Sequence, residues 1–269
     1  MTQSRTQSRS AAAPAPVARP LFYRDPVLLR FEEHRGKGLK PASGFAFSAA
    51  ATAVPLLLGE FAQAARYFPI VFTVGDNPVP LAVLGLKEGR NLFVAADGGW
   101  RDGVYIPAYL RRYPFIVLET PNGGEPLLAV DAASDRFADL AQGAGATPLF
   151  EASGAPSAAT GEVMAFCHAF HQDHLRGAGF GQALAGHGLL AQRHATIRFA
   201  DESRAMLNGF SLVDEAAFRA LRDPDLLVDW HARGWLDAIS LHLASAGNWD
   251  SLMRLNAEQA ARPPQAATA

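Results

Sequence analysis

The chain contains very little cysteine: Cys167 is the single such residue among 269. One thiol cannot form an internal disulfide, and it excludes the zinc and iron–sulfur sites that need several cysteines. This usage is typical of a reducing compartment. Cys167 lies in the apolar run VMAFCHAF, residues 163–170, so we expect an inert buried thiol, with a reactive nucleophile as the alternative.

The sequence also lacks an excess of charge of either sign. Its 24 basic and 26 acidic residues give a formal net charge of −2, and its pI is near 6.4. Domains that follow nucleic-acid phosphates usually carry a strong basic excess or a basic stripe. The charge balance therefore argues against non-specific nucleic-acid binding. Because 49% of the residues are hydrophobic and 19% charged, most of the chain should fold.

Long hydrophobic runs are missing as well. No stretch approaches the roughly 20 apolar residues that span a bilayer. The most apolar candidate, residues 44–61, is short and is interrupted by Pro55, so we interpret it as core. The first twenty residues carry arginines and small residues without the apolar centre of a signal peptide. These features predict a soluble, cytoplasmic protein.

Standard catalytic and cofactor motifs are absent too. The sequence has no GxxxxGK[ST] phosphate loop, no GxSxG nucleophile elbow and no HExxH zinc helix. Residues 177–186, GAGFGQALAG, resemble a dinucleotide fingerprint, but Gln182 stands where the third glycine belongs. We therefore expect no cofactor, and the missing signatures favour a non-catalytic protein over an enzyme.

Composition divides the chain into four parts. Residues 1–20 and 257–269 are rich in small residues, proline and glutamine, which predicts disordered tails. Residues 21–140 predict an α+β sheet unit. Residues 141–256 predict a helix-rich part, packed on the first as one globular body.

The first half predicts strands, because short apolar runs rich in β-branched and aromatic residues alternate with turns containing Gly, Pro or Asn. Residues 58–68 predict a helix that Pro69 ends. Hairpin-length connections favour a mainly antiparallel sheet with this helix packed on it, an α+β fold. The predicted strands cover residues 26–31, 70–74, 80–86, 91–96, 115–120 and 126–131.

The second half predicts helices and one hairpin. Thr160 is a candidate N-cap for a helix over residues 160–177, with Gly177 at its end. Asp223 can cap a helix that starts at Pro224. The remaining predictions are a short helix over 179–190, a hairpin over 195–214 with its turn near DESR at 201–204, and two or three helices over 215–255.

Three histidines form the sharpest chemical pattern. His168, His171 and His174 are spaced by three, so adjacent members of a helix lie within reach of a shared ion. Two such steps turn the helix by about 600°, which separates His168 from His174 around the axis. A metal site would therefore need Asp173 or a distant ligand. The alternative is a partly exposed, histidine-rich helix end.

A second acid–base pattern lies at residues 32–35, Glu-Glu-His-Arg. A carboxylate beside an imidazole is suited to general acid–base chemistry. Neighbours on a strand point to opposite faces, however. We therefore predict a solvated turn.

The stretch YIPAYLRRYPF, residues 105–115, combines tyrosines with adjacent arginines, a composition typical of interaction hot spots. Arginine stacks on aromatic rings and binds carboxylates in a bidentate way. Two readings stay open: a structural seam in which one arginine pairs with a buried glutamate, or a ligand- or peptide-binding surface. Both readings can hold together if one arginine is structural and the other faces a groove. The candidate binding residues are Glu60, Trp100, Tyr105, Tyr109, Arg111, Arg112 and Tyr113.

Several long segments resemble the SapC family of bacterial proteins. In the first half these are residues 54–72, 81–94 and 105–117. In the second half, GLL with LNGFSLVDEAAFRAL and LDAISLHLASAGNWDSL resemble the C-terminal part of that family. The resemblance extends from about Tyr23 to Leu255.

The resemblance implies a role more than a reaction. The family is named for an association with surface-layer proteins, and its members are often encoded near TonB-dependent outer-membrane receptors and flavin-dependent tryptophan halogenases. This implies a supporting function in the uptake or modification of a substrate, with no catalytic residues to carry over. We expect an accessory protein that binds a peptide, protein segment or small ligand, with a halogenase or receptor-linked protein as partner. The alternatives are a metal-assisted enzyme using the histidine helix and a cytoplasmic factor in surface-layer biogenesis.

Overall fold

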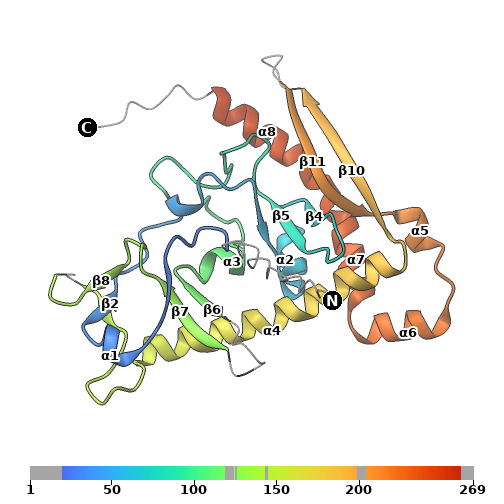
Figure 1. Cartoon of the computed structure of the whole chain (residues 1–269). Coiled ribbons are helices and arrows are strands. Elements are labelled where there is room, and N and C mark those ends of the chain that lie inside the picture. The colour runs from blue at the N-terminus through green and yellow to red at the C-terminus, as the bar shows by residue number, and fades with distance from the viewer. Residues whose placement is uncertain (1–19, 119–123, 125, 143–144, 199–203, 262–269) are drawn as a thin grey trace, which may run out of the picture.

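The computed structural model describes residues 20–118, 124, 126–142, 145–198 and 204–261 (Figure 1). Antiparallel sheets and several helices build it, which confirms the predicted α+β class. The predicted tail at 1–20 lies outside the described residues except for Pro20, and so does the end of the other tail, 262–269.

The largest sheet has five strands and joins both halves of the chain. Its residue Phe72 lies in the main buried core, together with Phe61, Phe68 and Phe180 from outside the sheet. The strands, in spatial order, are β10 (Leu190–Arg198), β11 (Arg204–Val213), β4 (Ile70–Thr73), β5 (Pro80–Val83) and β3 (Ala53–Pro55). Because β11 pairs with β4, the predicted late hairpin completes a sheet that the early strands begin. Its predicted turn, DESR, lies mostly outside the described residues.

Two smaller sheets account for the remaining strands, so the single predicted sheet is three sheets. The hairpin of β6 and β7 pairs with the early strand β1 and not with β5. One three-stranded sheet is β1 (Pro26–Leu28), β7 (Leu127–Asp131) and β6 (Phe115–Leu118), and the other is β8 (Phe137–Asp139), β2 (Lys37–Leu39) and β9 (Thr147–Pro148).

Two local predictions in the first half are wrong. Residues 91–96 form an isolated bridge between Val94 and Trp100 in place of a strand, because the side chain of Asn91 accepts the Phe93 amide in a tight turn at 2.9 Å. Residues 32–35 are not a solvated turn: helix α1 (Phe31–His34) buries its last residue. The other early helical elements are η1 (Ala46–Ser48), η2 (Leu58–Glu60), α2 (Phe61–Ala64) and α3 (Ala108–Arg111).

Helix α4 (Ala158–Gly186) is one helix of 29 residues where we predicted two. Ser157, and not Thr160, caps it, by accepting the Thr160 amide. Gly177 does not end it, and Gly181 packs so closely on the Pro78 carbonyl that a side chain would not fit. Gly181 therefore serves the close packing of the helix on Pro78, whereas a Cβ at Gly177 would meet nothing within 4 Å. Figure 1 shows α4 along one side of the molecule, and it contacts both β6 and η2.

Four helices end the described chain, one more than the largest number we predicted. Asp223 caps one of them and Pro224 occupies its first turn, as predicted. They are α5 (Glu215–Arg219), α6 (Pro224–Ala232), α7 (Trp235–Ala244), followed by η3 (Ser245–Gly247), and α8 (Asn248–Ala261).

Helix α8 continues through residues 257–261, which we predicted to be tail. Contacts with the first half explain the added turn. Gln259 accepts a hydrogen bond from Arg90 at 3.1 Å and donates to the Leu92 carbonyl at 3.0 Å. No helix among the described residues has both the length and the apolar character needed to cross a membrane.

Candidate functional site

Glu60 lies at the centre of the predicted Tyr/Arg cluster and is buried. It accepts hydrogen bonds from the Tyr105 hydroxyl at 2.7 Å and from the amides of Ala108 at 2.6 Å and Leu57 at 2.9 Å. Burial raises the pKa of this carboxyl, and the hydrogen bonds oppose the rise. Glu60 therefore joins η2 to α3, which is the structural seam that the sequence left open.

Arg111 belongs to the same seam. Its Nη2 donates to the Tyr105 hydroxyl at 3.1 Å and its Nε to the Ile106 carbonyl at 3.0 Å. The guanidinium thus reaches Glu60 through Tyr105, and not as the direct arginine–glutamate pair of the structural reading. The Arg111 side chain is otherwise exposed.

Arg112 occupies a different environment. Its guanidinium carbon lies 4.2 Å from the ring centroid of Tyr109 and 4.2 Å from that of Phe170 on α4, and side-chain hydrogen bonds connect it with the hydroxyls of Tyr23 and Tyr109. Its Nε is buried without a hydrogen-bond partner, and within the described residues no carboxylate forms an ion pair with it. A half-buried cation without a counter-ion is costly, so this site is suited to receive an anion.

The guanidinium forms part of the wall of a cavity of about 350 Å³, which we call the Arg112 pocket. Its polar and aromatic lining residues are Tyr109, Arg112, Cys167, Phe170, His171 and His174. Its apolar lining residues are Pro20, Pro55, Ile116, Val117 and Leu118. This combination of one cation, rings and aliphatic side chains fits a ligand that carries an acidic group on an apolar body.

Helix α4 supplies one whole face of the pocket. Cys167, Phe170, His171 and His174 follow the spacing i, i+3, i+4, i+7, which places them on one side of a helix. Cys167 is buried, and burial raises the pKa of its thiol to about 11. The structure therefore confirms that the thiol is buried, whereas its inertness stays a prediction.

The histidines do not act as one group. His171 and His174 line the Arg112 pocket, whereas His168 lines a separate cavity beside Leu128 and Met164. This separation is the one expected from their helical spacing. Among the residues that the structure describes, no group of three or more His, Cys, Asp or Glu side chains is placed to hold a metal ion.

The other candidate residues lie away from the pocket. Trp100 stacks on Phe93 at a centroid distance of 5.8 Å. Tyr113 stacks on Phe47 at 4.2 Å, and its hydroxyl donates to Asp131 at 3.0 Å. Of the seven predicted binding residues, the structure therefore brings two, Tyr109 and Arg112, into one pocket.

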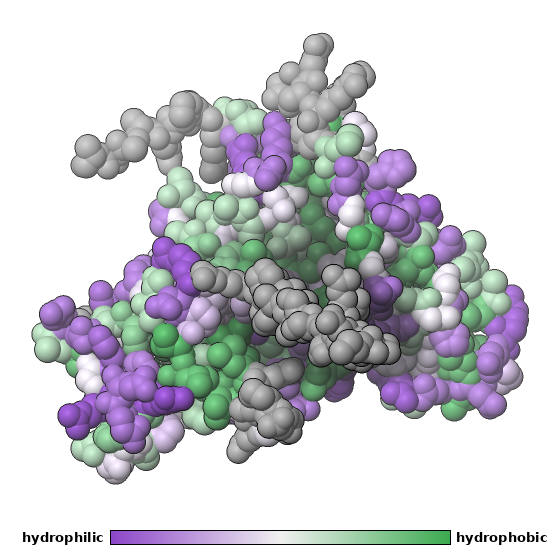
Figure 2. Space-filling view, viewed as in Figure 1, coloured by the Kyte–Doolittle hydropathy of each residue, from purple (hydrophilic) through white to green (hydrophobic). Residues whose placement is uncertain are grey.

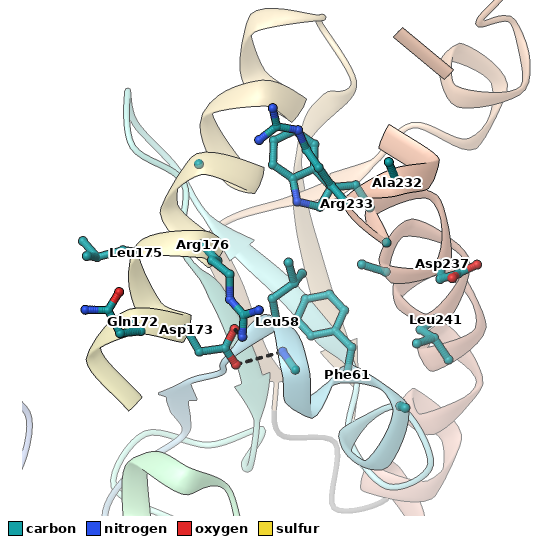
Figure 3. Close-up of a pocket in the computed structure, with 16 residues that line it drawn as sticks. Leu58, Phe61, Gln172, Asp173, Leu175, Arg176, Ala232, Arg233, Asp237 and Leu241 are labelled. Carbon is teal, nitrogen blue, oxygen red and sulfur yellow. Dashed lines mark hydrogen bonds and ion pairs between the residues drawn. The ribbon is translucent and has the colours of Figure 1, made fainter. Parts of the chain in front are cut away.

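A larger cavity, of about 740 Å³, lies between α4, α2 and the start of α7 (Figure 3). Three of its four charged side chains are paired inside the protein. Arg176 pairs with Asp173 at 2.9 Å, and Asp173 also accepts the Gly59 amide at 3.0 Å. Arg233, at the other wall, pairs with Asp229 at 2.8 Å. Both arginines of this cavity therefore already have a carboxylate partner, which Arg112 lacks within the described residues.

Figure 2 shows where side chains of each kind gather on one face of the molecule. Hydrophobic residues collect over the region of β6 and β7, and hydrophilic ones surround it near α1. Three of the apolar residues of the Arg112 pocket, Ile116, Val117 and Leu118, belong to β6.

The SapC family model matches residues 29–252. The chain belongs to the SapC family. The resemblance noted from the sequence is therefore confirmed. No curated protein and no solved structure matches the chain. The SapC match contains every residue of the Arg112 pocket except Pro20.

The sequence alone did not identify Phe170 as a site residue. It also did not predict that the arginine–tyrosine stretch and the histidine helix lie side by side. The arginine–tyrosine stretch and the histidine helix were separate candidates, yet in this SapC family chain they form one pocket. The helical spacing of Cys167, Phe170, His171 and His174 was a usable signal for a shared face. Nothing in the sequence indicated that Arg112 faces that side.

Proposed function

We propose that this SapC family member is a non-catalytic accessory protein that binds an acidic group of a peptide, protein segment or small ligand in the Arg112 pocket. The observation that carries the proposal is the guanidinium held between two rings, with its Nε buried and unpartnered. A ligand anion would provide the missing counter-charge at a geometry already fixed by Tyr109 and Phe170. The aliphatic walls would receive the apolar body of the ligand.

The partner in this proposal is a halogenase or receptor-linked protein, as the family resemblance implies, and the setting is the cytoplasm predicted from the sequence. Specific binding without chemistry suits a supporting role of this kind. The pocket offers recognition through one arginine and rings, the residue types that dominate binding energy at interfaces.

The test is a pull-down of tagged full-length protein from the native organism at its own expression level. Proteins, small molecules and metals in the eluate are identified by mass spectrometry. We expect a specific partner or ligand that is lost with Arg112→Gln and retained with Arg111→Gln. Arg111 is the matched control because it is the adjacent arginine but lies outside the pocket. Melting temperatures of both variants verify that they fold.

Two results would contradict the proposal. The first is a partner that both variants retain equally. The second is a protein without partner that carries stoichiometric metal lost on His171→Ala, which would support the metal-assisted enzyme.

A further inference from the structure

The Arg112 pocket lies along the open edge of a sheet. Strand β6 is the outer strand of the order β1-β7-β6, and three consecutive residues, Ile116, Val117 and Leu118, line the pocket. Successive side chains of a strand point to opposite faces. Val117 accordingly packs in the cluster of Cys167, and Leu118 in the cluster of Ile116 on the other face. A cavity that touches both must run along the strand edge.

The register shows which backbone groups face this edge. The Asp131 amide donates to the Pro114 carbonyl at 2.9 Å, and Phe115 is opposite Val130. Pro114 and Asp131 therefore form a hydrogen-bonded pair of the ladder. The next pair along the strands, Phe115 and Val130, is then a non-hydrogen-bonded pair. Such pairs alternate along an antiparallel ladder, so Val117 and Leu128 form the next one. The N–H and C=O of Val117 therefore point away from β7, toward the pocket.

Phe115 has the same orientation, but its outward groups are occupied. Its amide donates to the Arg112 carbonyl at 2.8 Å, and its carbonyl accepts the Tyr23 hydroxyl. Val117 has no such hydrogen bond within the described residues. A strand added to β6 can therefore pair at Val117 but cannot continue past it toward Phe115. The added strand must stop pairing there, and the same pocket holds the guanidinium of Arg112.

We infer that the Arg112 pocket binds the C-terminal end of an extended peptide, which pairs with the edge of β6 at Val117 and places its terminal carboxylate on Arg112. The inference rests on the proposed binding function and names its ligand class. Backbone pairing supplies sequence-independent affinity, the aliphatic walls select apolar side chains, and the cation selects a chain terminus. Charge complementarity and the blocked pairing at Phe115 both favour a peptide that ends at this point.

The experiment uses isotope-labelled full-length protein and NMR. The probe is a pool of N-acetylated pentapeptides, randomised over Ala, Val, Leu, Thr and Ser, with free C-terminal carboxylates. The same pool with C-terminal amides is the control. We expect the acid pool to shift both the Val117 amide and the Arg112 Nε–H resonance. The amide pool should bind at least tenfold more weakly, and Arg112→Gln should abolish the acid effect while Arg111→Gln retains it.

Three outcomes would overturn the inference. The acid and amide pools could bind equally well, or amidated peptides with an internal aspartate could bind as well as the acid pool. In the third outcome, acetate or benzoate shifts the Arg112 resonance, and the peptides shift it too but leave the Val117 amide unchanged. The last would leave a small-acid site. If the pull-down partner is lost with Arg112→Gln while the acid and amide pools behave alike, the proposed function stands and this inference falls. If the pull-down partner binds the Arg112→Gln variant as well as the wild type, the proposed function itself is wrong.

Discussion

The chemistry of Cys167 depends on where α4 places it. The side chain is 2% exposed, and burial raises the pKa of the thiol to about 11 from an ordinary value of 9.0. Two pKa units lower the thiolate fraction about 100-fold, and only the thiolate is nucleophilic. We predict that iodoacetamide at pH 8 alkylates the folded protein at least 100-fold more slowly than the urea-unfolded chain, as measured by intact mass over time. Equal rates would show an open, reactive thiol.

His242 makes the stability depend on pH. It is buried, its Nε2 accepts the Val213 amide at 3.1 Å, and burial lowers its pKa to about 4. Below its unfolded pKa of 6.5 the unfolded chain binds a proton that the folded chain does not. Stability is therefore complete above about pH 6.5 and is lost as the pH falls toward 4, by about 1.4 kcal/mol per pH unit within that window.

The measurement is urea denaturation of the wild type and of His242→Gln at several pH values between 4 and 7. Glutamine removes the titration while keeping a polar acceptor. We expect the variant to be less stable at pH 7 but to show a shallower pH dependence. Parallel curves for the two proteins would assign the slope to other groups.

At the scale of elements, the glycines of α4 test how closely this helix packs. A Cβ at position 181 would overlap the Pro78 carbonyl, whereas nothing lies within 4 Å of a Cβ at position 179. We predict that Gly181→Ala destabilises the protein by about 1–3 kcal/mol through overpacking. Gly179→Ala should stabilise it by up to about 1 kcal/mol through helix propensity. Chemical denaturation at one pH compares both variants, and a stabilising Gly181→Ala would refute the close contact.

The elements that the sequence predicts well are those with strong local signals. Strands such as β4 and β7 carry strong local signals, and the Asp223–Pro224 start of α6 is a local capping pattern. Gly177 carries the same local signal as a helix end, yet α4 continues through it to Gly186. The packing that decides between the two is a long-range property. A single sequence therefore predicts the presence of a helix or strand better than the residues at which it begins and ends.

The site shows the same limit. The composition of residues 105–115 singled out a tyrosine–arginine cluster, and a seam in which one arginine pairs with a buried glutamate was one of the two readings. The identity of the arginine that faces a cavity depends on which one meets α4 at the end of α3. Phe170 lies 58 positions after Arg112 in the chain, and only the fold brings its ring to 4.2 Å from the guanidinium.

At the scale of the whole molecule, the two halves of the chain are interleaved. Strand β11 pairs with β4, and the Ser245 hydroxyl accepts the Ile70 amide at 2.9 Å. The side chain of Asn248 donates to the carbonyls of Ala65 and Phe68, at 2.7 and 3.1 Å. A boundary near position 140, which composition suggests, therefore cuts through one sheet and one core.

We predict that residues 21–140, expressed alone, do not fold cooperatively. The fragment keeps β3, β4 and β5 but loses β11, and Phe72 loses the rings of Phe180 and His242 that pack on it. A three-stranded remnant with one open core face is not expected to be stable. Near-ultraviolet circular dichroism and thermal melting should show no fixed packing, whereas adding residues 141–269 in trans should restore a cooperative transition. A fragment that melts as sharply as the full chain would establish an independent first domain and would contradict the interleaved core.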